Sequence, residues 1–162
     1  MRRLQTTNVF LIALSFLIGI FLTIIPLPQW AIWLRPQFIF AILLFWVITS
    51  PSQCGVGTAF IVGLLMDLVT GTPIGEHAAV FVFLIYIVLK LHAAIMHFPP
   101  VQQAGVIAIF TAFNAILQSL ILSFAGHSTH VGLYALSAIT TAMIWPWLFA
   151  LLDKLRPRAF IY

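Results

Sequence analysis

The sequence consists of long apolar runs separated by short breaks rich in proline and glycine. A membrane-spanning helix needs about 20 mostly apolar residues, and a backbone within lipid must satisfy its own hydrogen bonds. Only 6% of the residues are charged and 63% are hydrophobic, so polar side chains are too few to cover a water-facing globule. The chain is therefore predicted to be an all-α, polytopic integral membrane protein with six helices, over about residues 9–25, 37–50, 55–70, 77–96, 101–124 and 131–152.

The first apolar run could be mistaken for a secretory signal because it follows Arg2 and Arg3. However, the run is longer than a typical signal core, and Pro26 and Pro28 stand where a small-residue cleavage site is needed. We therefore expect it to be the first helix of a compact six-helix transmembrane bundle, a single domain over residues 1–162.

Basic residues are distributed unevenly between the two ends of such a bundle. With six helices, one end collects all but one of the seven Lys and Arg residues, and the other end has only Arg35. Because Lys and Arg are retained on the cytoplasmic side of a lipid bilayer, both termini are predicted to be cytoplasmic. The basic residues form no stripe typical of nucleic-acid binding, so no nucleic-acid partner is expected.

One apolar run has small residues at four-residue spacing, interrupted by one carboxylate: Gly55, Ala59, Gly63, Asp67, Gly71 and Gly75. Gly57 adds another small residue near its start. Residues four apart share a helix face, and a face of small residues lets a second helix backbone approach closely. This helix is therefore predicted to lie in the middle of the bundle.

Asp67 is the carboxylate in that stripe. It lies about 18 Å from Gly55 along a helix, in the outer half of the membrane, where an ionisable group is costly unless it is paired. Arg35, followed by Pro36 at the start of the second helix, enters the membrane from the same side. We expect an ion pair between Asp67 and Arg35. The alternatives are that Asp67 is hydrated at the interface, or that it takes part in ion transport or catalysis.

Two further features indicate helix contacts. Asn114 and Gln118 are four residues apart, so they share a face and are expected to hydrogen-bond across helices. Near the end of the sixth helix, Pro146 is expected to kink the helix, and Trp145 and Trp147 are expected to anchor it at the interface. The alternative for this motif is a lipid-facing belt with an incidental proline.

The sequence has no grouping of residues that is typical of catalysis or of a cofactor site. The serines lack a nearby base, the only carboxylates are Asp67, Glu76 and Asp153, and no phosphate-binding loop follows Gly55. Glu76 is instead expected to cap the start of a helix. The histidines are poorly spaced for one metal ion, and Cys54 is the single cysteine. No catalytic residue, cofactor or metal ion is therefore predicted.

In the order of these motifs, the chain resembles the bacterial rod shape-determining MreD family. The resemblance covers most of the chain and rests on these motifs: Arg35-Pro36, Gly55-Val56-Gly57 through Gly63, Asp67, Gly71 and Gly75, and Trp145-Pro146-Trp147 before a basic tail. The length of the chain and its even number of helices also fit this family.

The resemblance implies a role in cell-wall synthesis. The chain would be a non-catalytic scaffold subunit of the elongation complex in the bacterial inner membrane. It would bind MreC and, through MreC, be coupled to MreB, to the RodA glycosyltransferase and to its partner class B transpeptidase. The family is also similar in expected fold to the substrate-binding subunits of energy-coupling-factor vitamin transporters.

That similarity supplies a rival hypothesis, a transport subunit that binds a small molecule. Such a site needs several polar side chains that converge in the outer half of the bundle. Only Arg35, Asp67, Glu76 and Asn114 are expected there, which is too few for a typical site. The third hypothesis is an enzyme, but the sequence lacks any grouping of acid, base and nucleophile.

Overall fold

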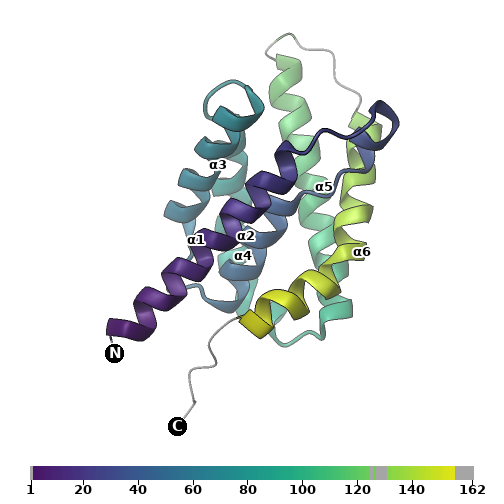
Figure 1. Cartoon of the computed structure of the whole chain (residues 1–162). Helices are drawn as coiled ribbons and strands as arrows, with labels where there is room; N and C mark the ends of the chain where they lie inside the picture. The colour runs from purple at the N-terminus through teal and green to yellow at the C-terminus, as the bar shows by residue number, and fades with distance from the viewer. Residues whose placement is uncertain (1, 125, 127–130, 156–162) are drawn as a thin grey trace.

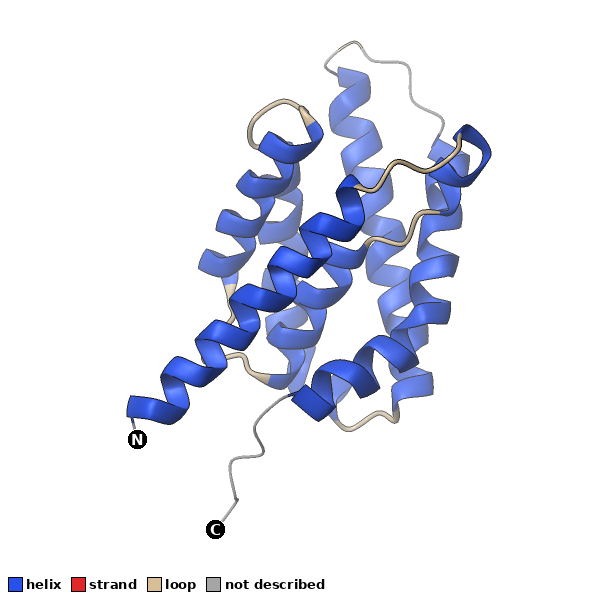
Figure 2. Ribbon diagram, viewed as in Figure 1, coloured by secondary structure: helices blue, strands red, loops and turns tan. Residues whose placement is uncertain are grey.

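A computed structural model describes residues 2–124, 126 and 131–155 of the chain (Figure 1). All regular structure in these residues is helical (Figure 2). The elements are α1 (Arg2–Ile24), the short 3-10 helix η1 (Gln29–Leu34), α2 (Phe38–Thr49), α3 (Val56–Thr70), α4 (Glu76–Met96), α5 (Pro100–Phe124) and α6 (Val131–Leu155). The prediction of an all-α chain with six α-helices is therefore confirmed for the described residues.

Helix α2 forms the centre of the bundle. All of its residues from Ile39 to Ile48 are buried, and it contacts α1, α4, α5 and α6. A helix that is apolar on every side must be covered by other helices or by lipid, and here the neighbouring helices cover it. It is about 18 Å long, too short to cross the hydrocarbon alone, but its neighbours extend beyond both of its ends (Figure 1).

Helix α3, which carries the glycine stripe, lies at the edge of the bundle. It packs against α4 and more lightly against α1, and it exposes Phe60, Ile61 and Leu68. The prediction that this helix lies in the middle is therefore wrong. The physical reason is that small residues cover only one face of α3, whereas the apolar surface of α2 is continuous around the helix.

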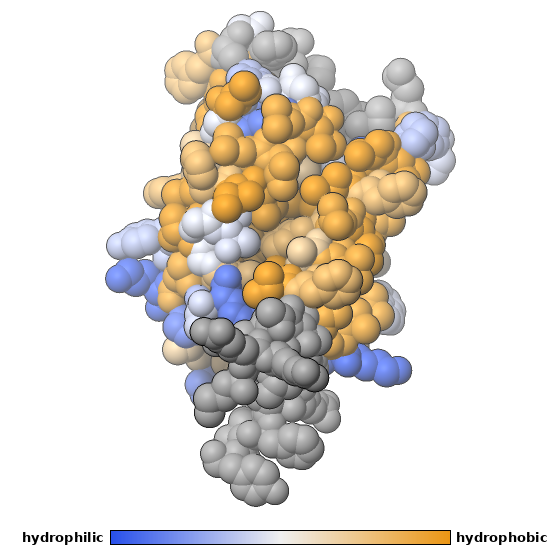
Figure 3. All heavy atoms as spheres, turned by 60° about the vertical axis from the view of Figure 1, so that its left-hand side comes forward, coloured by the Kyte–Doolittle hydropathy of each residue, from blue (hydrophilic) through white to orange (hydrophobic). Residues whose placement is uncertain are grey.

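Several helices are suited to a membrane by length and composition. Glu76–Met96, Pro100–Phe124 and Leu136–Leu155 are long and apolar enough to span one, and the apolar segments Val9–Ile24, Phe38–Thr49 and Val56–Thr70 are shorter. Apolar side chains cover most of the middle of the surface in Figure 3, and the most hydrophilic residues gather near its lower end. These findings support a membrane protein.

The start of α1 and the end of α6 lie at the same end of the bundle (Figure 1). This arrangement follows from an even number of α-helices that run alternately up and down. Helix α1 begins at Arg2, well before the apolar run that starts at Val9, because the intervening residues contain neither glycine nor proline to stop a helix.

Pro146 lies inside α6, and the last part of this helix bends toward the middle of the bundle (Figure 1). Proline removes one backbone hydrogen bond and crowds the preceding turn, which is a common cause of a kink. Trp145 is fully buried in the core, whereas Trp147 is 74% exposed. The expectation that both tryptophans anchor the helix at the interface is therefore wrong for Trp145. Residues two apart in an α-helix point to different sides of the helix, so the two tryptophans cannot share one surface.

Candidate functional site

Helices α3 and α4 are in backbone contact at Gly63. A Cβ atom on Gly63 would lie 2.4 Å from the Cα and 2.6 Å from the backbone nitrogen of Ala78, so no larger residue fits without separating the helices. Gly55 and Gly57 differ, because a Cβ there would meet nothing within 4 Å. Within α3 and its N-cap, the glycine that allows close packing is therefore Gly63.

Gly71 and Gly75 lie outside α3 and shape the turn that leads into α4. Gly71 ends α3 with a φ of 68°, and Gly75 precedes α4 with a φ of 101°. Residues with a side chain rarely adopt these positive values, so glycine is required here for its backbone conformation. The turn brings the first residues of α4 back against the last turn of α3.

The folded turn surrounds the buried carboxylate of Asp67 with donors. Its oxygens accept hydrogen bonds from the backbone N–H of Gly75 at 2.7 Å and of His77 at 2.8 Å, and from the Thr72 hydroxyl at 3.2 Å. The His77 Nδ1 atom lies 2.9 Å from Oδ1 of Asp67 and forms an ion pair with it when protonated. Asp67 therefore fastens α3 to the start of α4.

The predicted ion pair between Asp67 and Arg35 is wrong. Arg35 instead donates from Nη1 to the carbonyl of Thr23 at 2.5 Å and from Nη2 to the carbonyl of Ile25, at the end of α1. The last carbonyls of a helix have no partner within it and carry partial negative charge, so a guanidinium is a favourable cap. Pro36 lies two residues before Phe38, the first residue of α2, and its carbonyl accepts a hydrogen bond from the Phe38 N–H at 2.9 Å.

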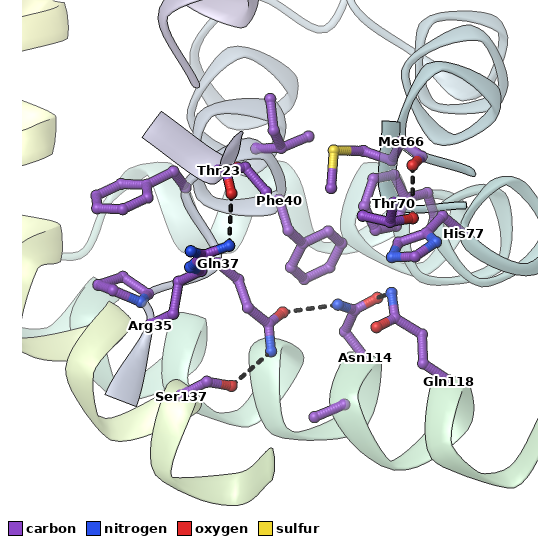
Figure 4. Close-up of a pocket in the computed structure, with 15 residues that line it drawn as sticks. Thr23, Arg35, Gln37, Phe40, Met66, Thr70, His77, Asn114, Gln118 and Ser137 are labelled. Carbon is purple, nitrogen blue, oxygen red and sulfur yellow. Dashed lines mark hydrogen bonds between the residues drawn. The ribbon is translucent and has the colours of Figure 1, made fainter. Parts of the chain in front are cut away.

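A network of hydrogen bonds joins the start of α2 to α5 and α6 (Figure 4). The side-chain amide of Gln37 donates to Ser137 Oγ at 2.9 Å and accepts from Asn114 Nδ2 at 2.6 Å. The backbone N–H of Gln37 donates to Thr141 Oγ1 at 3.0 Å. The Gln118 amide donates to Asn114 Oδ1 at 3.2 Å. Asn114 thus reaches across elements as expected, whereas this bond of Gln118 stays within α5.

A pocket of about 240 Å³ lies between Arg35 and this network (Figure 4). Its polar lining residues are widely separated in the sequence: Thr23, Arg35, Gln37, Thr70, His77, Asn114, Gln118 and Ser137. More polar side chains converge here than sequence reasoning expected, since Gln37, His77 and Ser137 were not identified as candidates. The signal for Gln37 was a single polar residue between Pro36 and the long apolar run.

The described residues contain no group of three or more His, Cys, Asp or Glu side chains placed to hold a metal ion. His127 and His130 lie outside the described residues. Cys54 is buried just before α3, and burial raises the pKa of its thiol to about 11. Because the thiolate is the reactive form, this cysteine is a weak nucleophile at neutral pH.

Glu76 is the first residue of α4 and the acidic residue in the first turn of that helix. The residue is buried, and its Oε2 atom has no hydrogen-bond partner among the described residues. Its position near the positive end of the α4 dipole agrees with the role predicted for it at the start of this helix.

A second cavity, of about 320 Å³, is an apolar groove between α1 and α6. Its walls are formed by side chains of these two helices, and its floor is formed by α2 residues Phe38, Ile42 and Trp46. Trp46 is held in place by a 2.8 Å hydrogen bond from its Nε1 to Ser15 Oγ. We call this cavity the α1–α6 groove.

Comparison with known proteins identifies the family of the chain. Residues 4–155 match the family of the rod shape-determining protein MreD. The chain is also 30% identical, over 148 residues, to a rod shape-determining protein MreD from Haemophilus influenzae, and the match covers 91% of each protein. No solved structure matches the chain, so similarity to vitamin-transporter subunits stays a prediction. The chain belongs to the MreD family of rod shape-determining proteins.

Proposed function

We propose that this protein is a non-catalytic scaffold subunit of the wall-elongation complex and that it binds the membrane anchor of MreC in the α1–α6 groove. The family indicates a role in cell shape. The observation that carries the proposal is the groove itself, an apolar surface between α1 and α6, which both expose large apolar side chains.

The dimensions of the groove suit a single membrane-spanning helix. Its walls run from Leu11 to Leu22 on α1 and from Ile144 to Leu155 on α6, which is about 17 Å, or three helical turns, along each helix. Apolar helices in lipid associate through close packing, because lipid tails are as apolar as their side chains. A preformed groove increases the packing area that one partner helix gains.

In this proposal the protein lies in the bacterial inner membrane with both termini in the cytoplasm. The uneven distribution of Lys and Arg supports that orientation. MreC would connect the bundle to MreB, to RodA and to the partner class B transpeptidase of RodA. The protein's contribution would then be to hold the MreC anchor in position rather than to carry out a reaction.

A matched pair of substitutions tests the groove. Leu14 lies in the groove and is 39% exposed, and Leu65 lies outside it on α3 and is 42% exposed. Leu14→Trp would fill the groove, so we expect it to reduce co-purification of MreC and to turn rod-shaped cells round when it is the only copy. Leu65→Trp should leave both unchanged. Equal effects of the two variants would contradict docking in the groove.

A transport subunit is the second candidate, and the polar pocket favours it. Depletion of the protein separates the two functions. The scaffold hypothesis predicts round cells with unchanged uptake of vitamins and other small solutes. Cells that stay rod-shaped but no longer accumulate a solute would instead support transport.

A further inference from the structure

We propose that the polar pocket binds the phosphate group of an anionic lipid. This site is separate from the α1–α6 groove. Among the described residues, the linings of the two cavities have only Phe38 in common. The charge of the pocket, its apolar walls and its depth in the membrane suit such a ligand.

The charge of the pocket favours an anion. Arg35 lines it, and no carboxylate does among the described residues. The nearby carboxylate of Asp67 is bonded to Thr72, His77 and the Gly75 backbone, and it forms no ion pair with Arg35 among the described residues. Two N–H groups of Arg35 are bonded to carbonyls of α1, but its buried Nε atom has no partner among the described residues. A buried donor without an acceptor is costly, and a phosphate oxygen is a strong acceptor for a guanidinium.

The amides on the far side of the pocket can complete the contact. Asn114 and Gln118 lie across from Arg35 in Figure 4, and Gln118 is only partly buried. Each side-chain amide nitrogen carries two hydrogens. The Asn114 nitrogen donates one hydrogen bond, to Gln37, and the Gln118 nitrogen donates one, to Asn114. A second hydrogen on each nitrogen is therefore available to a ligand oxygen.

The remaining walls are apolar and suit the acyl part of a lipid. Ile39, Phe40, Met66 and Phe81 line the pocket beside the polar groups. A free phosphate ion would gain nothing from these side chains, because apolar surfaces do not replace its hydration. An amphiphile with an anionic head and an apolar body would use both parts of the pocket.

The depth of the pocket is that of lipid headgroups. The preceding helix η1 carries Trp30, which is 74% exposed. Exposed tryptophans are enriched where the hydrocarbon meets the headgroups. Arg35 follows η1 directly, so its guanidinium lies where a lipid phosphate is at high local concentration.

Binding to the purified full-length protein in a neutral detergent tests the proposal. The ligands are dioctanoyl phosphatidylglycerol, zwitterionic dioctanoyl phosphatidylcholine and inorganic phosphate, measured by native mass spectrometry and thermal shift. We expect saturable binding of phosphatidylglycerol at one site, with an affinity at least about tenfold higher than for the other two. Equal binding of the two lipids, or equally tight binding of inorganic phosphate, would overturn the proposal.

Substitutions locate the site. Arg35→Gln should weaken phosphatidylglycerol binding by about tenfold, whereas the control Lys90→Gln, which lies outside the pocket, should not. Because Arg35 also caps α1, Gln118→Leu is a second test that leaves that cap intact, and it should weaken binding by about threefold. Unchanged binding in Gln118→Leu, or in a folded Arg35→Gln, would place the lipid elsewhere and contradict the proposal.

Discussion

Helix α2 and the polar pocket are neighbours, yet different forces hold them in place. Helix α2 is stabilised by van der Waals packing of apolar side chains on all sides, and no one of these contacts requires a hydrogen bond in a fixed direction. The pocket is formed by hydrogen bonds between groups far apart in sequence, such as Gln37 with Ser137 and Asn114. Helix α2 should therefore tolerate apolar substitutions that conserve volume, whereas the pocket region should depend on particular polar atoms.

The largest effect is expected at Asp67. Asp67→Ala leaves the backbone N–H groups of Gly75 and His77 without their acceptor, and we expect a loss of about 3–5 kcal/mol in the free energy of unfolding. Unfolding in mixed micelles with a denaturing detergent measures this loss of free energy.

A double-mutant cycle tests the partners of Asp67. The cycle with His77→Ala should show strong coupling, whereas the effects of Asp67→Ala and Arg35→Gln should be additive within about 0.5 kcal/mol. Strong coupling to Arg35 would contradict the observed contacts.

The next effect is expected at the contact between α3 and α4. Gly63→Ala places a Cβ against the Ala78 backbone, so it should cost about 1–3 kcal/mol in the same unfolding assay. Gly57→Ala is the matched control in the same helix, because its Cβ meets nothing within 4 Å. It should be neutral or stabilise by about 0.5–1 kcal/mol, since alanine favours a helix. Similar losses in both variants would refute the close contact at Gly63.

A smaller effect is expected in the hydrogen-bond network. Gln37→Leu removes bonds to both α5 and α6, so it should cost about 1–2 kcal/mol in the free energy of unfolding. Gln118→Leu removes one bond within α5 and should cost about 0.5–1 kcal/mol. If Gln118→Leu were the more damaging of the two, Gln37 would not be the centre of the network.

The smallest effect is expected in α2. Leu44→Met keeps the volume and the apolar character of a fully buried side chain, so it should cost less than about 1.5 kcal/mol. The same unfolding assay compares it directly with Gln37→Leu. A loss greater than that of Gln37→Leu would show that α2 depends on exact shape as strongly as the network depends on its hydrogen bonds.

The helices were easier to predict from the sequence than the contacts of the pocket region, because apolar runs are local in sequence and the pocket's hydrogen bonds are not. The helices follow from local apolar runs and from breaks at proline and glycine, so the sequence was sufficient to predict six of them. The central position of α2 could not be derived from its continuous apolar surface, because lipid covers such a surface as well as other helices do. Helix α3 was expected at the centre because a glycine stripe suggests close packing along a whole helix, whereas Gly63 alone makes the backbone contact within α3.

The contacts of the pocket region depend on how the chain turns back, which apolar periodicity does not reveal. Asp67 meets His77 because positive φ angles at Gly71 and Gly75 fold the intervening turn. Arg35 meets the end of α1 because the 3-10 helix η1 returns the chain to it. A pairing argument based on charge and depth alone therefore joined the wrong partners.

We propose above that the α1–α6 groove holds the membrane anchor of MreC. The most direct measurement is photo-crosslinking in living cells, with a photoreactive amino acid placed at Leu14 or Leu151 in the groove, and at Leu65 or Leu68 on α3 as controls. We expect the two groove positions to crosslink to the anchor of MreC and the α3 positions not to. Crosslinks to MreC from α3 and none from the groove would contradict the account.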